Sequence, residues 1–277
     1  MKNNHKFTVL LPVYKNVSFI LFFRAFNSII KQTLKADEVI VLIDGPVNKE
    51  IKEFLRIQKN IKIFNSKKNI GLGKILKIGV KISSYNIIAR ADADDYSLPK
   101  RFENQINFLK KNPEIDILSS NVEEVFNDII YGIRKLPTRH NLILKMMKFR
   151  NPINHSSVIF KKKIIIKCGN YLDLKNFEDY FLWVRALKFG AKFSNINKML
   201  VKMTVDDNFY NRRKGLVYYL YYLRFLNKIF KIRFISIYEF LILGLVKLPI
   251  VLLPKILFKN FYRIFLRTHR VKFFYFN

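Results

Sequence analysis

The stretch "NIIARADADDYSLPKR", residues 86–101, decides the fold. Its first part, "NIIARAD", is short and apolar and predicts a buried strand. The next residues place Asp92, Asp94 and Asp95 close together in a chain whose net charge is +31. Carboxylates this close repel unless a cation or a proton lies among them. The cluster therefore indicates a metal site or a proton-handling site at the end of a strand.

Short apolar runs alternate with helical patterns on the N-terminal side of this stretch. This alternation predicts an α/β fold with a Rossmann-like, mostly parallel central sheet that helices cover on both faces. The predicted strands are residues 7–14, 38–45, 61–65 and 86–92, and the predicted helices are residues 18–32 and 72–83. Ligands bind beyond the carboxyl ends of such strands, so the polar residues there should share one rim. They are Tyr14 and Asn16, Asp44 and Gly45, residues 65–69, and Asp92 to Asp95.

The pattern after residue 99 is less regular and predicts α+β material that completes the same domain. The predicted helices are residues 100–114, 140–149 and 176–190, and the predicted strands are residues 115–126, 131–136 and 155–162. The single cysteine, Cys168, excludes an internal disulfide and fits a buried position in a reducing compartment. The N-terminus lacks the pattern of a cleaved leader, which predicts a cytosolic protein.

From Arg212 onward the chain is aromatic, aliphatic and basic, with Glu239 as its one acid. Residues 235–254 are apolar enough to approach a membrane span, but Glu239, Lys247 and Pro249 make spanning costly. Residues 212–277 therefore predict a C-terminal extension of basic amphipathic helices that lie on an anionic membrane surface. The alternative is that these helices pack on the rest of the chain or on a partner subunit.

The pair Asp92 and Asp94 suits Mg²⁺ or Mn²⁺ that bridges substrate phosphates, because these ions prefer oxygen ligands. Asp95 is expected to cap the helix that follows. Three rival sites lack essential residues: the segment has no calcium-loop glycine and glutamate, no aspartyl-phosphatase threonine, and no Gly-Lys-Ser/Thr phosphate loop in "GLGKIL".

Six segments in order resemble family-2 glycosyltransferases, with the amylovoran-biosynthesis-like group as the nearest match. They are "TVLLPVYKN", "EVIVLIDGP", "NSKKNIGLGKILKIGV", "IIARADADDYSLPKR", "NPINHSSVIFKK" and "FEDYFLWVRALKFG", between about Phe7 and Thr204. The resemblance implies a glycosyltransferase-A fold, a nucleotide-sugar donor, a divalent metal and inversion at the anomeric carbon. It also implies a catalytic domain over residues 1–211, with a nucleotide-binding half to about residue 110 and an acceptor-side half after it.

The resemblance also implies roles for single residues. Asp94 is the metal ligand, with Asp92 beside it near the ribose, and Asp44 contacts the base; "IDGP" departs from the family's usual Asp-Asp-Gly-Ser. Asp179 is the catalytic base, supported by Glu178, at the start of a helix where the dipole favours ionised carboxylates. The remaining donor-side residues are Pro12, Val13, Tyr14, Asn69 and Gly71, and His155 lies on the acceptor side. Apart from the resemblance, Arg212 and Arg213 are suited to bind the diphosphate, with a solvated charged loop as the alternative. Trp183 is expected either to stack on a sugar at the acceptor side or to fill the core, and the core is favoured.

These observations predict an inverting, metal-dependent enzyme that transfers one sugar from a nucleotide-sugar, with a UDP-sugar as the expected donor, to a lipid-linked or growing surface glycan. It would act in the cytoplasm, on the inner face of the cell membrane. The processive members' Gln-x-x-Arg-Trp motif is absent, so single transfer is favoured. The alternative is a non-enzymatic basic protein that binds membranes or nucleic acid, although the tail resembles no nucleic-acid module and no nucleic-acid partner is expected.

Overall fold

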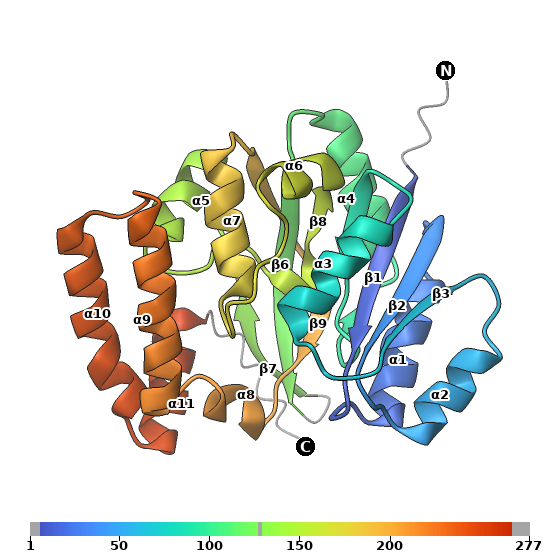
Figure 1. The fold of residues 1–277 in the computed structure, drawn as a ribbon, viewed down its shortest axis with the longest axis horizontal. Helices are drawn as coiled ribbons and strands as arrows, with labels where there is room; N and C mark the ends of the chain where they lie inside the picture. Colours follow the sequence, from blue (N-terminus) through green and yellow to red (C-terminus); the bar gives the residue numbers. More distant parts are fainter. Residues whose placement is uncertain (1–5, 127–128, 268–277) are drawn as a thin grey trace, which may run out of the picture.

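The computed structural model describes residues 6–126 and 129–267. Nine strands form one sheet in the order β3-β2-β1-β4-β8-β6-β9-β5, with β7 paired to β6 (Figure 1). The strands are β1 Phe7–Val13, β2 Glu38–Asp44, β3 Lys62–Ser66, β4 Ile87–Arg90, β5 Tyr96–Ser97, β6 Ile117–Phe126, β7 Ile129–Arg134, β8 Ile159–Lys161 and β9 Phe193–Thr204. The predicted α/β fold is confirmed.

Four neighbouring strands at one side of the sheet are all parallel, in the order β3, β2, β1 and β4. Their carboxyl ends therefore meet at one rim, which faces downward in Figure 1. Strands β1 and β2 are buried along their whole length, which explains their near-continuous apolar sequences. The predicted common rim is thus present in the structure.

Helices cover both faces of the sheet, as predicted. They are α1 Phe19–Ile30, α2 Lys49–Arg56, α3 Leu72–Ile82, α4 Arg101–Lys111, α5 His140–Met147, α6 Lys162–Lys167 and α7 Glu178–Lys188, with a 3₁₀ turn at His155–Ser157. A hydrophobic core lies on each face of the sheet, and the side chains of β1 point alternately into one core and the other. Val9 and Leu11 pack on the side of α1 and α4, whereas Leu10 packs on the side of α3 and α7.

The second half of the sheet is mixed, and β9 is the longest of the elements that the sequence did not predict, which also include α2, β5 and α6. Strand β9 runs parallel to β6 and antiparallel to the short β5, which directly follows the acidic cluster. Two of its polar residues, Ser194 and Asn195, are buried: Asn195 accepts from Ser119 and donates to the Pro137 and Pro152 carbonyls. Because these partners lie far away in sequence, no alternation of polar and apolar residues reveals the strand.

The C-terminal residues are helical, as predicted, in α8 Asp207–Asn211, α9 Gly215–Lys231, α10 Ile237–Leu252 and α11 Lys255–Leu266. Helix α9 packs on α7, where Phe225 stacks on Phe177 and contacts Tyr180 with centroid distances of 5.0 and 4.5 Å. Helix α10 lies outside α9 at the edge of the molecule (Figure 1). Within residues 6–126 and 129–267, no helix has both the length and the apolar character needed to cross a bilayer.

Glu38, the first residue of β2, links β2 to β1 and β3 by hydrogen bonds at the amino ends of the strands, opposite the rim. Its buried carboxylate accepts hydrogen bonds from Thr8 of β1, Lys62 of β3 and Ser84 before β4, at 2.6 to 2.8 Å. Burial alone would raise the pKa of Glu38, but the hydrogen bonds from Lys62, Thr8 and Ser84 outweigh it and lower the pKa to about 2. The carboxylate is therefore a stabilising anion at neutral pH.

We predict that Glu38→Gln lowers the free energy of unfolding by about 2 kcal/mol at pH 7, after allowance for solvent screening of the exposed Lys62. Because the folded pKa lies below the unfolded one, this stabilisation is present above the unfolded pKa and is lost as the pH falls toward 2. Urea unfolding across this pH range measures it. The control Glu53→Gln, at an exposed carboxylate, should change little. If the stability of Glu38→Gln fell with decreasing pH as steeply as that of the wild type, the ionised Glu38 carboxylate would not be the source of this stabilisation.

Candidate functional site

Four polar groups meet at the rim where β1 and β4 end. Burial raises the pKa of the Tyr14 hydroxyl, Asp94 raises it further, and the Arg212 guanidinium lowers it. Asp92 also contributes, so Tyr14, Asp92, Asp94 and Arg212 lie close together. Arg212 follows α8, which lies at this edge of the sheet in Figure 1. The structure thus brings together residues that are nearly 200 positions apart in the sequence.

Val13 differs from its expected role. Its side chain is fully buried in the core beneath α1, so it positions Tyr14 and does not line a pocket. Pro12 is buried as well, in register with Leu42 of β2. Neither side chain is available at the surface of the rim, because both lie inside a strand that is covered on both faces.

Asp44 closes the next part of the rim by binding the loop before α3. Its two carboxylate oxygens accept from the backbone N–H groups of Ile70 and Gly71, at 2.7 and 3.0 Å, and Asn69 donates to its carbonyl. Gly45, with a φ of +82°, lets this loop approach, because a Cβ there would lie 2.6 Å from the Asn69 nitrogen. Asp44 therefore orders the loop that contains Asn69 and Gly71, and its expected contact with a base stays a prediction.

Arg90, the last residue of β4, is a buried cation that sequence reasoning missed although it lies in the opening stretch. Its two terminal nitrogens donate to the two oxygens of Asp92, and Arg101 donates to its carbonyl. Burial alone would lower the pKa of Arg90, but Asp92 raises it. Asp92 is consequently held in a bidentate ion pair, and its expected part in metal binding stays a prediction.

Asp94 is the carboxylate best suited to hold a metal ion. Burial and the neighbouring Asp92 raise the pKa of Asp94 to about 6, whereas Arg90 and Arg212 lower it. A cation next to Asp94 would relieve this repulsion, and a hard oxygen ligand suits Mg²⁺ or Mn²⁺. The described residues contain no group of three metal-binding side chains, so substrate oxygens and water would complete the coordination.

Asp95 does not cap the next helix, which corrects the expectation from sequence. Helix α4 begins at Arg101, and Asp95 instead accepts from the backbone N–H of Thr204 at 2.9 Å. The Thr204 hydroxyl donates to the Asp94 carbonyl at 2.5 Å. Burial, with Asp92 and Asp94 nearby, raises the pKa of Asp95 well above its usual value. The end of β9 thus fixes the loop that carries Asp94.

Glu178 and Asp179 form the first turn of α7, as predicted. Burial, rather than the helix dipole, dominates their electrostatics: it raises the pKa of both, to about 7 for Glu178. Asp179 accepts a hydrogen bond from the Asn151 side chain at 2.7 Å, and Arg134 donates to the Asn151 carbonyl at 2.7 Å. Asn151 is a second residue that sequence reasoning missed, and its position in the matched segment "NPINHSS" was the available signal.

Arg90 connects the two halves of the site. Its charge lowers the pKa of Asp94 on the rim and that of Glu178 and Asp179 at the start of α7. The acidic cluster and the acidic helix start therefore face a common buried cation. The structure places the two predicted acidic centres in one site.

His155 and Trp183 support this site from within the core. The His155 ring bonds the Tyr171 hydroxyl at 2.8 Å and meets Trp183 edge to face. Burial, and then Arg90, lower the pKa of His155 well below its usual value, so the ring is neutral at pH 7. Trp183 is fully buried and packs on Phe160, so of its two expected roles, sugar stacking and core filling, the structure shows core filling.

Arg213 is engaged locally. Its guanidinium stacks on the Phe209 ring at 3.7 Å and donates to the Phe209 carbonyl at 2.7 Å. Of the two arginines expected to bind an anion, Arg212 is the one that the structure brings to Tyr14 and Asp94. Anion binding by Arg213 stays a prediction.

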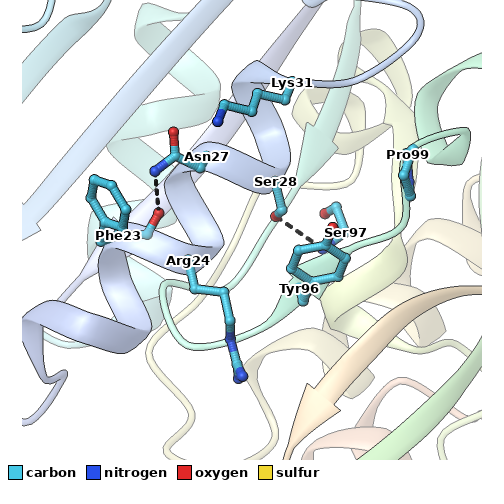
Figure 2. Close-up of a pocket in the computed structure, with 8 residues that line it drawn as sticks. All are labelled: Phe23, Arg24, Asn27, Ser28, Lys31, Tyr96, Ser97 and Pro99. Carbon is cyan, nitrogen blue, oxygen red and sulfur yellow. Dashed lines mark hydrogen bonds between the residues drawn. The ribbon is translucent and has the colours of Figure 1, made fainter.

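A hollow of about 390 Å³ lies between α1 and β5 (Figure 2). Its lining includes Arg24, Tyr96 and Ser97, and Ser28 of α1 accepts from the backbone N–H of Ser97 at 3.0 Å. None of the residues that the sequence singled out lines it. The hollow is therefore lined by other residues than those of the candidate site at the rim.

Comparisons with known proteins agree with this geometry. Residues 8–167 match the sequence profile described as glycosyl transferase family 2. An Escherichia coli UDP-Gal:alpha-D-GlcNAc-diphosphoundecaprenol beta-1,3-galactosyltransferase is 37% identical over 254 residues, which are 90% of this chain and 92% of that protein. The amylovoran biosynthesis glycosyltransferase AmsE of Erwinia amylovora is 33% identical over 215 residues, 76% of this chain and 81% of AmsE.

Solved structures show the same fold. S. aureus TarS residues 1–349 in complex with UDP-GlcNAc superimposes with a TM-score of 0.59 at 20% identity, over 82% of this chain and 73% of that one. The mannosyltransferase PcManGT from Pyrobaculum calidifontis in complex with GDP-Man and Mn²⁺ gives 0.60 at 14% identity, over 82% and 64%. The fold is therefore the glycosyltransferase-A fold.

We predict that Asn151→Ala raises the pKa of Asp179 further, because the ionised carboxylate loses a hydrogen bond that lowers it. Carboxyl-carbon NMR of ¹³C-aspartate-labelled protein measures the shift, with the missing signal of Asp179→Asn as the assignment. Asn141→Ala is the matched control, since the Asn141 side chain accepts only from its neighbour Leu142 on the surface. An unchanged Asp179 pKa in Asn151→Ala would show that the amide does not stabilise the anion.

Proposed function

Since the chain belongs to glycosyl transferase family 2, a family of nucleotide-sugar-dependent enzymes, we propose that it transfers one sugar with inversion from a UDP-sugar to a lipid-linked or growing surface glycan. The choice of UDP and of a lipid diphosphate acceptor rests on the name of the E. coli relative, which aligns along nine-tenths of both chains. Membership of the family sets aside a purely non-enzymatic binding protein.

One observation carries the proposal: the rim and the start of α7 present two acidic centres, and the charge of the buried Arg90 lowers the pKa of carboxylates in both. Tyr14, Asp94 and Arg212 form the donor end. Glu178 and Asp179 form the acceptor end. An inverting transfer needs two separate groups, one for the leaving diphosphate and one for the acceptor proton.

At the donor end the leaving diphosphate gains negative charge. Arg212 supplies a guanidinium that can bind two phosphate oxygens. A Mg²⁺ or Mn²⁺ ion held by Asp94 would neutralise further charge on the diphosphate. Asp44 holds the loop of Asn69 and Gly71 against the nucleotide side of the rim.

At the acceptor end Asp179 takes the proton. The acceptor hydroxyl oxygen forms a bond to the anomeric carbon, the bond from that carbon to the diphosphate breaks, and the hydroxyl proton moves to Asp179. Attack from the face opposite the leaving group inverts the anomeric centre. Burial makes the Asp179 carboxylate more basic, while the Asn151 hydrogen bond keeps it ionised and oriented.

Glu178 is the second candidate for the base, and a specific observation favours it. The pKa of Glu178 is raised to about 7, and its Oε2 has no hydrogen-bond partner among residues 6–126 and 129–267. A buried carboxylate that titrates near neutral pH is a competent general base. We retain Asp179 as the base because its orientation is fixed by Asn151.

We further propose that the enzyme acts in the cytoplasm, on the inner surface of the cell membrane, where a lipid-linked acceptor would lie. The relatives named for a diphosphoundecaprenol acceptor and for amylovoran synthesis support this location. The basic C-terminal helices are the part of the chain proposed to bind that surface.

We predict that Asp179→Asn lowers kcat at least about 100-fold, the usual contribution of a general base, while UDP-sugar binding is unchanged. Glu178→Gln is the matched comparison, because it removes one charge from the adjacent residue and should reduce kcat by less than about tenfold. A screen of UDP-, GDP- and dTDP-sugars with a synthetic lipid-diphosphate acceptor identifies the donor, and isothermal calorimetry measures its binding.

Two results would change the assignment. A large loss in Glu178→Gln with a small loss in Asp179→Asn would move the base to Glu178. Absence of any nucleotide binding, with or without Mn²⁺, would contradict the proposed transfer itself.

A further inference from the structure

The outward side of α10 is a continuous apolar surface. Seven large apolar side chains of this helix are between 47% and 75% exposed, although the helix belongs to a folded chain. They are Ile237, Tyr238, Leu241, Ile242, Leu245, Val246 and Leu252. Because an α-helix turns by about 100° per residue, these seven positions all lie on one half of the helix circumference. A monomeric protein rarely exposes a patch of this kind without a partner.

The two charged residues of α10 point away from this surface. Lys247 lies over the rings of Tyr218 and Tyr222, with 5.5 Å to each centroid, and burial lowers its pKa to about 8. The Glu239 carboxylate accepts a hydrogen bond from Lys148, at the end of α5, at 2.7 Å and one from the backbone N–H of Ser236 at 2.8 Å. The charges that break the apolar pattern in the sequence therefore leave the exposed half of the helix uninterrupted.

The neighbouring helices α9 and α11 also carry exposed apolar side chains. Leu216, Val217 and Leu220 of α9 are exposed, as are Ile256 and Leu257 of α11. Figure 1 shows α10 as the outermost element on this side of the molecule, so its outward face meets no other described element.

Exposed cations lie at one end of this surface. Arg224, Lys228, Lys231 and Arg233 occupy the last turns of α9 and the turn into α10. Apolar side chains next to lysine and arginine match the interface of an anionic bilayer, in which headgroups attract the cations and acyl chains accept the apolar groups. Helix α10 has 16 residues, about 24 Å at 1.5 Å per residue, which is shorter than a bilayer core.

We propose that α10 lies in the plane of an anionic membrane, with Leu241, Ile242 and Leu245 in the headgroup and acyl boundary and the α9–α10 turn against the headgroups. This inference deepens the proposed function, because it names the surface that would bring the rim to a lipid-linked acceptor. It does not depend on transfer, since membrane binding can be measured without donor or acceptor.

Sedimentation of the full chain with vesicles tests the inference. The wild type should bind vesicles of equal parts phosphatidylglycerol and phosphatidylcholine and bind pure phosphatidylcholine far less. The double substitution Leu241→Glu and Leu245→Glu should weaken partitioning into the anionic vesicles at least about tenfold. The matched control is Ile57→Glu with Ile166→Glu, two exposed apolar residues of the catalytic fold, which should bind as the wild type does.

Two further measurements keep the outcomes separate. Sugar transfer to a soluble acceptor should be unchanged in Leu241→Glu/Leu245→Glu. This measurement distinguishes a failure of membrane binding from a failure of the proposed sugar transfer. Wild-type protein that ignores anionic vesicles would overturn the inference. A wild-type dimer that the Leu241→Glu/Leu245→Glu pair dissociates, without any vesicle binding, would overturn it in favour of a second copy of the chain.

Discussion

The buried ion pair between Arg90 and Asp92 is the interaction on which the site depends. A guanidinium inside the sheet is tolerated only because a carboxylate accepts from both of its terminal nitrogens. Arg101 adds a hydrogen bond to the Arg90 carbonyl, and this ties α4 to the same point. Since Arg90 ends β4, the pair also fixes where the strand stops and the acidic loop begins. Removal of Asp92 would leave the buried Arg90 guanidinium without its carboxylate partner.

The same cation moderates two groups of acids that burial would otherwise neutralise. Burial raises the pKa of Asp94 on the rim and of Glu178 at the start of α7, to about 6 and about 7, and Arg90 opposes both shifts. Carboxylates in this range can be ionised at neutral pH and still respond to a nearby proton or cation. The rim is therefore suited to a metal and a diphosphate, and the start of α7 to a proton from a hydroxyl.

The sequence revealed the parts of the structure that local patterns determine. Strands β1 and β2 were predictable because residues buried on both faces give a continuous apolar run, and their common rim followed from parallel pairing. Strand β9 was not, because its buried Asn195 finds partners far along the chain. Asp95 resembled a helix cap, yet its partner is Thr204, 109 residues away. The residue type of Trp183 left sugar stacking and core filling open, and its full burial decides for the core.

Anomalous diffraction from crystals grown with UDP and Mn²⁺ tests the role of Asp94 most directly. The predicted result is a single manganese peak bonded to the Asp94 carboxylate and to the diphosphate, at about 2 Å from each oxygen. Asp92 should keep its ion pair with Arg90, and Arg212 should contact the phosphates. A manganese peak at Glu178 and Asp179 instead, or UDP bound at the rim with no metal beside Asp94, would contradict the assignment.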